Sequence, residues 1–274
     1  MESFICSTCG VQYAASEVPP AKCIICEDER QWVRWEGQAW TTLAQMKKAG
    51  FHNVIKPEDP GESGIVGIGT QPSFAIAQRA LLVQTPHGNI LWDCISYLDD
   101  ETIGKVKSLG GVQAISMSHP HFYGVVVEWS HAFDDAPIYL PRADQRWVTR
   151  PDPSIRYYEG VQEVFPGVTL IQTGGHFDGS AVLHWAAGGN GKAALLSGDT
   201  ISVVMDRRFV SFMYSYPNNV PLSARVIRKM LRAVKPFAFD RIYGGWWGRV
   251  VASGGTNALR LSAERHIRMI QGKV

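Results

Sequence analysis

Two histidines separated by one proline, His119 and His121, are the residues of this chain with the clearest capacity for chemistry. They follow a short apolar run, Ala114 to Met117, which predicts a buried strand. Pro120 disfavours helix at the residue before it, so we expect an extended peptide whose alternate side chains point the same way. Two imidazoles in that arrangement can bind one metal ion, whereas the alternative is a pair of unrelated polar histidines in a loop.

Two later segments also end in residue types that bind metals. Residues 169–176 form an apolar run, a glycine turn and then His176, and residues 192–199 form an apolar run, a glycine and then Asp199. The chain therefore repeats one arrangement three times: a predicted strand, a turn of small residues and a possible ligand. Imidazole nitrogens and a carboxylate oxygen are common ligands of catalytic zinc.

This order of residues resembles the metallo-β-lactamase superfamily, whose signature is H-x-H-x-D-H, then Gly-His, then Gly-Asp, then a last histidine. The resemblance covers roughly residues 60 to 274. It implies the α+β class and an αββα sandwich, in which two sheets pack together and helices cover their outer faces. It also implies a metal-dependent hydrolase whose metal ligands are His119, His121, His176 and Asp199. Asp199 is a candidate catalytic residue as well, because it could act as general base to a metal-bound water in place of binding the ion.

The departures from that signature concern the second of the family's two metal positions. Tyr123 and Gly124 stand where the family has Asp-His, and Gly245-Trp246 stands near the place of the last histidine. The sequence therefore predicts one metal ion. Tyr123 is a candidate catalytic residue that could donate a hydrogen bond to an oxyanion, and the alternative is a plug in the vacated space. Asp93, at the end of an earlier strand, is expected to orient a histidine ligand.

Four of the five cysteines lie in the first 26 residues, as two C-x2-C pairs. They are Cys6, Cys9, Cys23 and Cys26. Two such pairs predict a tetrathiolate metal site, and the alternative of two disulfides is disfavoured without a secretory signal. The segment resembles a zinc ribbon or a short rubredoxin-like site. We therefore divide the chain into a four-cysteine module, residues 1–36, and a metallo-β-lactamase-like domain, residues 37–274.

Composition excludes several classes of function. Hydrophobic residues make up 45% of the 274 residues and charged residues 19%, as in ordinary globular proteins. The net charge of +2 gives no sign of a nucleic-acid or anionic-membrane surface. The first residues lack the pattern of a signal peptide, and no apolar run is long enough to span a membrane. We expect a cytoplasmic protein with a small-molecule substrate and without nucleic-acid or membrane partners, and find no signal for an oligomeric state.

Three hypotheses of function follow. The first is a hydrolase that uses one metal-activated water on an ester, lactone or similar acyl bond, with one zinc in the histidine site and one in the four-cysteine site, iron being possible in either. The second is a mononuclear non-haem iron oxidoreductase resembling persulfide dioxygenases, with the rubredoxin-like module transferring electrons. The third is a non-catalytic protein whose ribbon binds nucleic acid or another protein, and the nearly neutral charge counts against it.

Overall fold

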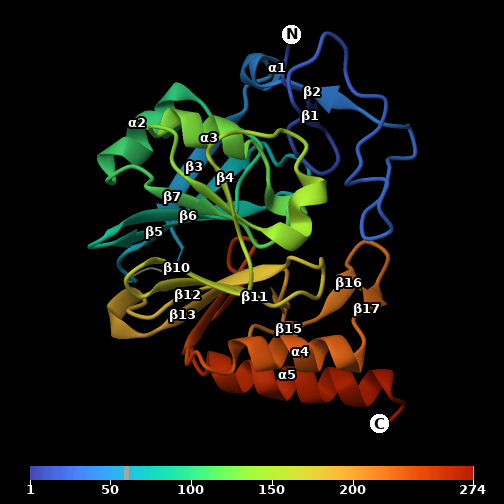
Figure 1. Cartoon of the computed structure of the whole chain (residues 1–274), viewed down its shortest axis with the longest axis vertical. Helices are drawn as coiled ribbons and strands as arrows, with labels where there is room; N and C mark the ends of the chain where they lie inside the picture. Colours follow the sequence, from blue (N-terminus) through green and yellow to red (C-terminus); the bar gives the residue numbers. More distant parts are fainter. Residues whose placement is uncertain (59–61, 274) are drawn as a thin grey trace.

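Two large β-sheets packed face to face form the body of the protein (Figure 1). The computed structural model describes residues 1–58 and 62–273. Helices lie on the outer side of each sheet, so the layers run helix, sheet, sheet, helix (Figure 1). This arrangement confirms the αββα sandwich that was expected from the sequence.

The first sheet has seven strands in the order β3-β4-β5-β6-β7-β8-β9. Neighbours are antiparallel from β3 to β6 and parallel from β6 to β9. Because parallel neighbours end at the same edge, the loops that follow β6 and β7 leave the sheet side by side. The strands are β3 (His52–Pro57), β4 (Ile65–Gln71), β5 (Arg79–Thr85), β6 (Gly88–Trp92), β7 (Ala114–Ser116), β8 (Ile138–Pro141) and β9 (Ile155–Tyr158).

The second sheet has six strands in the order β10-β11-β12-β13-β18-β19. Only β13 and β18 pair in parallel, and the other neighbours are antiparallel. Strands β11, β13 and β18 consequently run in the same direction and end at one edge. The strands are β10 (Val161–Phe165), β11 (Val168–Gln172), β12 (Ala181–Trp185), β13 (Ala194–Gly198), β18 (Arg241–Gly244) and β19 (Val250–Val251).

Alternation of side chains along the strands produces one core between the sheets and one outside each sheet. In β5, Leu81 and Val83 face the second sheet while Leu82 faces the outer helices. In β11, Leu170 faces the first sheet and Ile171 faces helices α4 (Ala224–Val234) and α5 (Gly255–Ile270). The strands are therefore apolar on both faces, as expected of sheets covered on both sides.

Short elements connect the layers. The sequence predicts helices over residues 100–109, 124–133, 143–149 and 223–234, the last with an apolar stripe. The first, second and fourth correspond to α2, α3 and α4 with ends within two residues, whereas residues 143–147 lie in a 3₁₀ helix and residues 148 and 149 lie beyond it. The helices are α1 (Leu43–Lys48), α2 (Asp100–Ser108), α3 (Val126–Ala132), η1 (Pro120–Phe122), η2 (Arg142–Trp147) and η3 (Gly189–Gly191). The short strands are β1 (Ile5–Cys6), β2 (Trp40–Thr41), β14 (Ser202–Val203), β15 (Val210–Ser211), β16 (Met213–Ser215) and β17 (Val220–Pro221).

The four-cysteine module packs against the first sheet and its helices. Its buried cysteines belong to the hydrophobic cluster that lies between the first sheet and its helices. This cluster includes Leu82 of β5 and Trp129 of α3. The backbone N–H of Gln12 donates to the oxygen of Gly124 at 3.0 Å, and that of Ala14 donates to the oxygen of Thr149 at 3.1 Å. Strand β1 pairs with β2, which lies beyond residue 36. The boundary between 1–36 and 37–274 stays a prediction, and extensive contacts cross it.

Candidate metal centre

Two loops, one from each sheet, bring the three predicted histidines together. His119 follows β7 in the first sheet, and His121 lies in the short turn η1 directly after it. His176 follows β11 in the second sheet, after a turn in which Gly175 has φ +111°. A Cβ at Gly175 would lie 2.7 Å from the sulfur of Met230, so both the backbone angle and the space demand glycine.

The local conformation differs from the sequence expectation at one point. His119 is extended, with φ −175° and ψ 176°, but Pro120 to Phe122 form the 3₁₀ turn η1. The expectation of an extended peptide through His121 is therefore wrong. Proline restricts the residue before it and is itself well suited to the first position of a helical turn. The two imidazoles still lie close together across this turn, with 5.0 Å between their ring centroids.

The nitrogens of the three histidines have the spacing of ligands that share one ion. One ring nitrogen from each histidine can be chosen so that all three lie within 4.8 Å of one another. Nε2 of His176 lies 3.3 Å from Nδ1 of His121. Tetrahedral zinc with its usual bond lengths to nitrogen would hold two nitrogens about 3.3 Å apart. The three residues thus fit a single zinc-sized ion.

Asp199, which follows β13, reaches the same place from the second sheet. Its Oδ1 lies 3.1 Å from Nε2 of His119, and neither atom has a hydrogen-bond partner among the described residues although both are buried. Buried polar atoms without partners are rare in folded proteins, and an ion between them would satisfy both. Asp199 lies outside the group of three histidine nitrogens defined above, so it meets the centre from the side of His119.

Neighbouring groups fix which nitrogen of two imidazoles is available. Nδ1 of His176 donates to the backbone oxygen of Met213 at 3.2 Å, which leaves the lone pair on Nε2. Nδ1 of His119 lies 3.0 Å from Oγ of Ser118, and a proton donated from Nδ1 to this hydroxyl would leave the lone pair on Nε2 in the same way. A fixed tautomer is what a histidine ligand requires.

Burial keeps the histidines in the neutral form that binds metals. The exposed fractions of His119 and His176 are 1%. Burial, assisted by the charges of the neighbouring imidazoles, holds the pKa of His119 and of His121 well below its ordinary value. Burial lowers the pKa of His176 to about 4. At neutral pH all three are neutral and can ligate.

The space beside the histidines is closed where a second ion would need ligands. A Cβ at Gly124 would lie 2.3 Å from the backbone oxygen of Ile95, so this position cannot carry a side chain without movement of the backbone. A Cβ at Gly245 would lie 2.6 Å from the ring of Phe122. That ring is 5.0 Å from His119 and packs against Trp246, whose indole N–H donates to Ile76.

Tyr123 is buried, and its ring makes no aromatic contact with the three histidines in the described part of the chain. Its hydroxyl has no hydrogen-bond partner there. Burial raises the pKa of Tyr123 well above its usual value, and the charge of Asp144 adds to the rise. Asp144 is buried too, accepts the N–H of Gly179 at 2.8 Å and was not singled out in the sequence.

Asp93 acts on the backbone and not on an imidazole. Its Oδ1 accepts the N–H of Ser118 at 2.7 Å, one residue before His119. Asp93 was expected to orient a histidine ring. It instead holds the backbone of Ser118, the residue before His119. A Cβ at Gly198 would lie 2.3 Å from Oγ of Ser118, so the loop carrying Asp199 passes very close to the same residue.

Arg30 approaches the centre from the four-cysteine module, and it was not among the residues singled out from the sequence. Its guanidinium carbon lies 4.7 Å from the centroid of the Phe177 ring and 4.6 Å from that of Tyr214. The Phe177 ring in turn lies 5.0 Å from His121 and 5.2 Å from His176. The charge of Arg30 contributes to the lowered pKa of both histidines.

The four cysteines form a second convergent group. Sγ of Cys6 lies 3.6 Å from that of Cys26, and Sγ of Cys9 lies 3.6 Å from that of Cys23. All four are buried and free, and these separations are far longer than the roughly 2.0 Å of a disulfide. Four thiolates around one tetrahedral zinc would lie about 3.8 Å apart, so the group fits an ion better than two disulfides.

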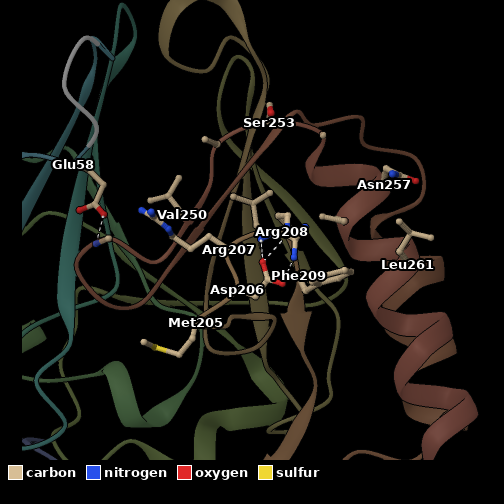
Figure 2. Close-up of a pocket in the computed structure, with 15 residues that line it drawn as sticks. Glu58, Met205, Asp206, Arg207, Arg208, Phe209, Val250, Ser253, Asn257 and Leu261 are labelled. Carbon is tan, nitrogen blue, oxygen red and sulfur yellow. Dashed lines mark hydrogen bonds and ion pairs between the residues drawn. The ribbon is translucent and has the colours of Figure 1, made fainter. Parts of the chain in front are cut away.

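A wide pocket of about 930 Å³ lies elsewhere, between the loop at Asp206, the turn before β19 and the start of α5 (Figure 2). Arg208 in this pocket pairs with Asp206 at 2.8 Å, as Figure 2 shows. The lining residues include none of the histidines or Asp199. This pocket is therefore separate from the cluster formed by the histidines and Asp199.

No family model matches the chain. The uncharacterized protein YmaE of Bacillus subtilis (strain 168) is 46% identical over 276 residues, covering 100% of this chain and 99% of YmaE. The chain belongs to the YmaE family. The similarity extends over the four-cysteine segment of this chain as well as over its two sheets.

Solved structures similar to this member of the YmaE family are much more distant in sequence. VMB-1 has a TM-score of 0.59 at 12% identity, covering 80% of this chain and 98% of VMB-1. The mono-zinc form of the metallo-β-lactamase FIM-1 from Pseudomonas aeruginosa has 0.56 at 14%, covering 79% and 96%. The metallo-β-lactamase DIM-1 has 0.55 at 12%, covering 78% and 98%. The fold is therefore that of metallo-β-lactamases. In the described residues, no helix is long and apolar enough to cross a membrane.

Proposed function

We propose that this protein is a metal-dependent hydrolase that uses one metal-activated water on an ester, lactone or similar acyl bond of a small molecule. The observation that carries the proposal is the convergence of three buried, neutral imidazoles, with Nε2 of His176 3.3 Å from Nδ1 of His121 and the carboxylate of Asp199 3.1 Å from His119. His119, His121 and His176 would hold the ion, and Asp199 would bind it or accept a proton from its water.

The chemistry requires an ion with a free position. Zinc held by three protein ligands lowers the pKa of a bound water to about 7 and polarises the oxygen of a carbonyl group. Asp199 is placed to accept the proton of that water, because its Oδ1 is buried beside His119 and has no other partner among the described residues. Burial of the imidazoles excludes competing water and strengthens the electrostatic interactions.

Zinc is the proposed ion in both sites, one in the histidine centre and one held by the four cysteines. Neutral imidazoles with a carboxylate suit zinc, and four thiolates suit zinc or iron. A likeness in fold to metallo-β-lactamases, one of them in a mono-zinc form, agrees with a single zinc in the histidine centre.

The test combines metal analysis with a substrate screen. The purified protein should contain two zinc equivalents and be colourless, and it should hydrolyse at least one compound in a panel of esters, thioesters and lactones. His176→Gln should lose one zinc and all hydrolysis, whereas Arg34→Gln, an exposed change in the module, should alter neither. Iron with thiolate absorption bands and no hydrolysis would favour the oxidoreductase hypothesis instead.

A further inference from the structure

Arg30 is the basic side chain whose charge acts on the histidine centre. Its exposed fraction is 9%, and it lies over Phe177, whose ring touches all three histidines. Arg30 forms an ion pair with Asp28 at 2.7 Å and both side chains are largely buried, whereas Arg208 in the wide pocket is highly exposed. The four-cysteine module therefore brings a buried arginine, together with its paired carboxylate, against Phe177.

The guanidinium of Arg30 is held in one orientation. It lies over the aromatic rings of Phe177 and Tyr214, and its Nη1 donates to both carboxylate oxygens of Asp28 at 2.7 and 2.9 Å. Its backbone is fixed as well, because the hydroxyl of Ser215 donates to the oxygen of Arg30 at 3.0 Å. A guanidinium fixed in this way loses little freedom when it binds a ligand.

Part of the guanidinium has no acceptor. Nε is buried without a hydrogen-bond partner, and Nη2 makes no hydrogen bond to the described residues. These two nitrogens form the edge of a guanidinium that recognises a carboxylate with two parallel hydrogen bonds. A buried cationic donor without an acceptor is costly, so an acceptor is expected to reach it in the working protein.

We propose that Arg30 is a specificity-determining residue that binds a carboxylate of the substrate. The acyl bond would lie at the metal position and the carboxylate at the free edge of Arg30. The substrate class is then an ester, thioester or lactone that carries a free carboxylate close to its acyl group. This inference rests on the proposed function, because it places the acyl bond at the histidine centre.

Small thiols can test the open metal position and the role of Arg30 separately. A thiolate binds zinc, so mercaptoacetate and 3-mercaptopropionate would test the metal and Arg30 together, while 2-mercaptoethanol and 3-mercapto-1-propanol test the metal alone. Binding to the zinc-loaded protein is measured by titration calorimetry, and the zinc content is checked after each titration. The wild type should bind at least one of the acids about tenfold or more tightly than its matched alcohol, as a charge-assisted pair would provide.

Three variants assign that preference. Arg30→Gln should lose the preference for the acids while binding the alcohols as before. Arg30→Lys should retain part of it, because the charge remains but the planar fork is lost. Arg34→Gln, an exposed arginine of the same module, should behave as the wild type. Circular dichroism shows whether each variant is folded.

The remaining outcomes overturn the proposal. Equal affinity for acids and alcohols in the wild type, or a preference that survives in Arg30→Gln, would remove the role of Arg30 in recognition. Equal weakening of acids and alcohols in Arg30→Gln would give Arg30 a structural role only. Failure of every thiol to bind the wild type would overturn the proposed open metal position, and the inference with it.

Discussion

The hydroxyl of Ser215 donates a 3.0 Å hydrogen bond to the backbone oxygen of Arg30, across 185 residues of sequence. Strand β16, which contains Ser215, also supplies the backbone oxygen of Met213 that accepts a hydrogen bond from His176. Tyr216, the next residue, donates its hydroxyl to the backbone oxygen of Asp199 at 2.7 Å. One short strand therefore touches the segment that follows the cysteines, a histidine and the aspartate of the centre.

The first prediction concerns the independence of the two sites. Replacing Cys6 and Cys9 together by serine should reduce the zinc content from two equivalents to one, because the cysteines and histidines form separate groups. Zinc is quantified after dialysis, and its affinity is measured by competition with a chelator. Loss of both ions together, or of neither, would contradict two separate sites.

The same double variant should become sensitive to protease. Its four-cysteine segment has few strands, and its cysteines are buried, so the metal would supply much of its folding energy. Limited proteolysis should cut before about residue 36, the predicted boundary, and leave the larger part of the chain intact. A digestion pattern unchanged from the wild type would show that contacts such as Gln12 to Gly124 suffice to hold the segment.

The second prediction is that Asp199→Asn lowers turnover at least about a hundredfold, the usual effect of losing a general base or a ligand. If Asp199 binds the ion, zinc affinity at the histidine centre should fall as well, by about tenfold or more. Asp206→Asn is the matched control, because Asp206 lies on an exposed loop and pairs with Arg208. Wild-type turnover in Asp199→Asn would remove Asp199 from the mechanism.

A residue of this site could be predicted from the sequence only where its neighbours along the chain form a recognisable pattern. His119, His176 and Asp199 each follow a predicted strand and a turn of small residues, which is a local pattern, and the sequence predicted these three and His121 as metal ligands. The structure brings the three histidines together, and the role of the four residues as ligands stays a prediction. Arg30 lies in the charged run Glu27 to Arg30, which is typical of any solvated loop, and only the packing against Tyr214 and Phe177 reveals its position. Distant contacts of that kind leave no trace in spacing or periodicity.

The fold shows the same division. The amphipathic stripe of α4 and the apolar runs of the strands were sufficient to place these elements, because their periods are set by burial. The turn at Pro120 and the 3₁₀ helix η2 were missed, since short segments with mixed residues are decided by tertiary packing. Two layers of sheet followed only from the family resemblance.

The third prediction is that the histidine centre holds one ion. An anomalous-scattering map of zinc-loaded crystals should contain one peak among His119, His121 and His176. The reason is that Gly124 and Gly245 have no side chains, and the surrounding atoms leave no room for one. A second peak of full occupancy within about 4 Å, the spacing of two-metal sites, would contradict this.

The fourth prediction concerns Tyr123, which the sequence offered either as a catalytic residue or as a plug. Tyr123→Phe should retain zinc and turnover, because the hydroxyl is buried and has no partner among the described residues, and burial is the main cause of its raised pKa. Removing an unsatisfied buried hydroxyl should change the free energy of unfolding by at most about 1 kcal/mol, and in the stabilising direction. Lost turnover with zinc retained would instead make Tyr123 catalytic.

The fifth prediction follows from Asp144, whose pKa burial raises to about 7. In the unfolded chain this carboxyl would ionise near pH 4, so between about pH 4 and pH 7 the folded state binds the extra proton. The free energy of unfolding should therefore fall across that interval, by on the order of 2 kcal/mol from this residue, and level off above it.

Asp144→Asn keeps an oxygen for the N–H of Gly179 but cannot ionise, so it should gain stability relative to the wild type as the pH rises from 4 to 8. Urea denaturation at several pH values measures the difference between the two proteins, which cancels the titration of all other groups. Asp206→Asn is the control, because Asp206 has a pKa of about 2, lowered by Arg208, and does not titrate in the interval. Parallel stability curves for Asp144→Asn and the wild type would show that Asp144 is ionised in the folded protein throughout.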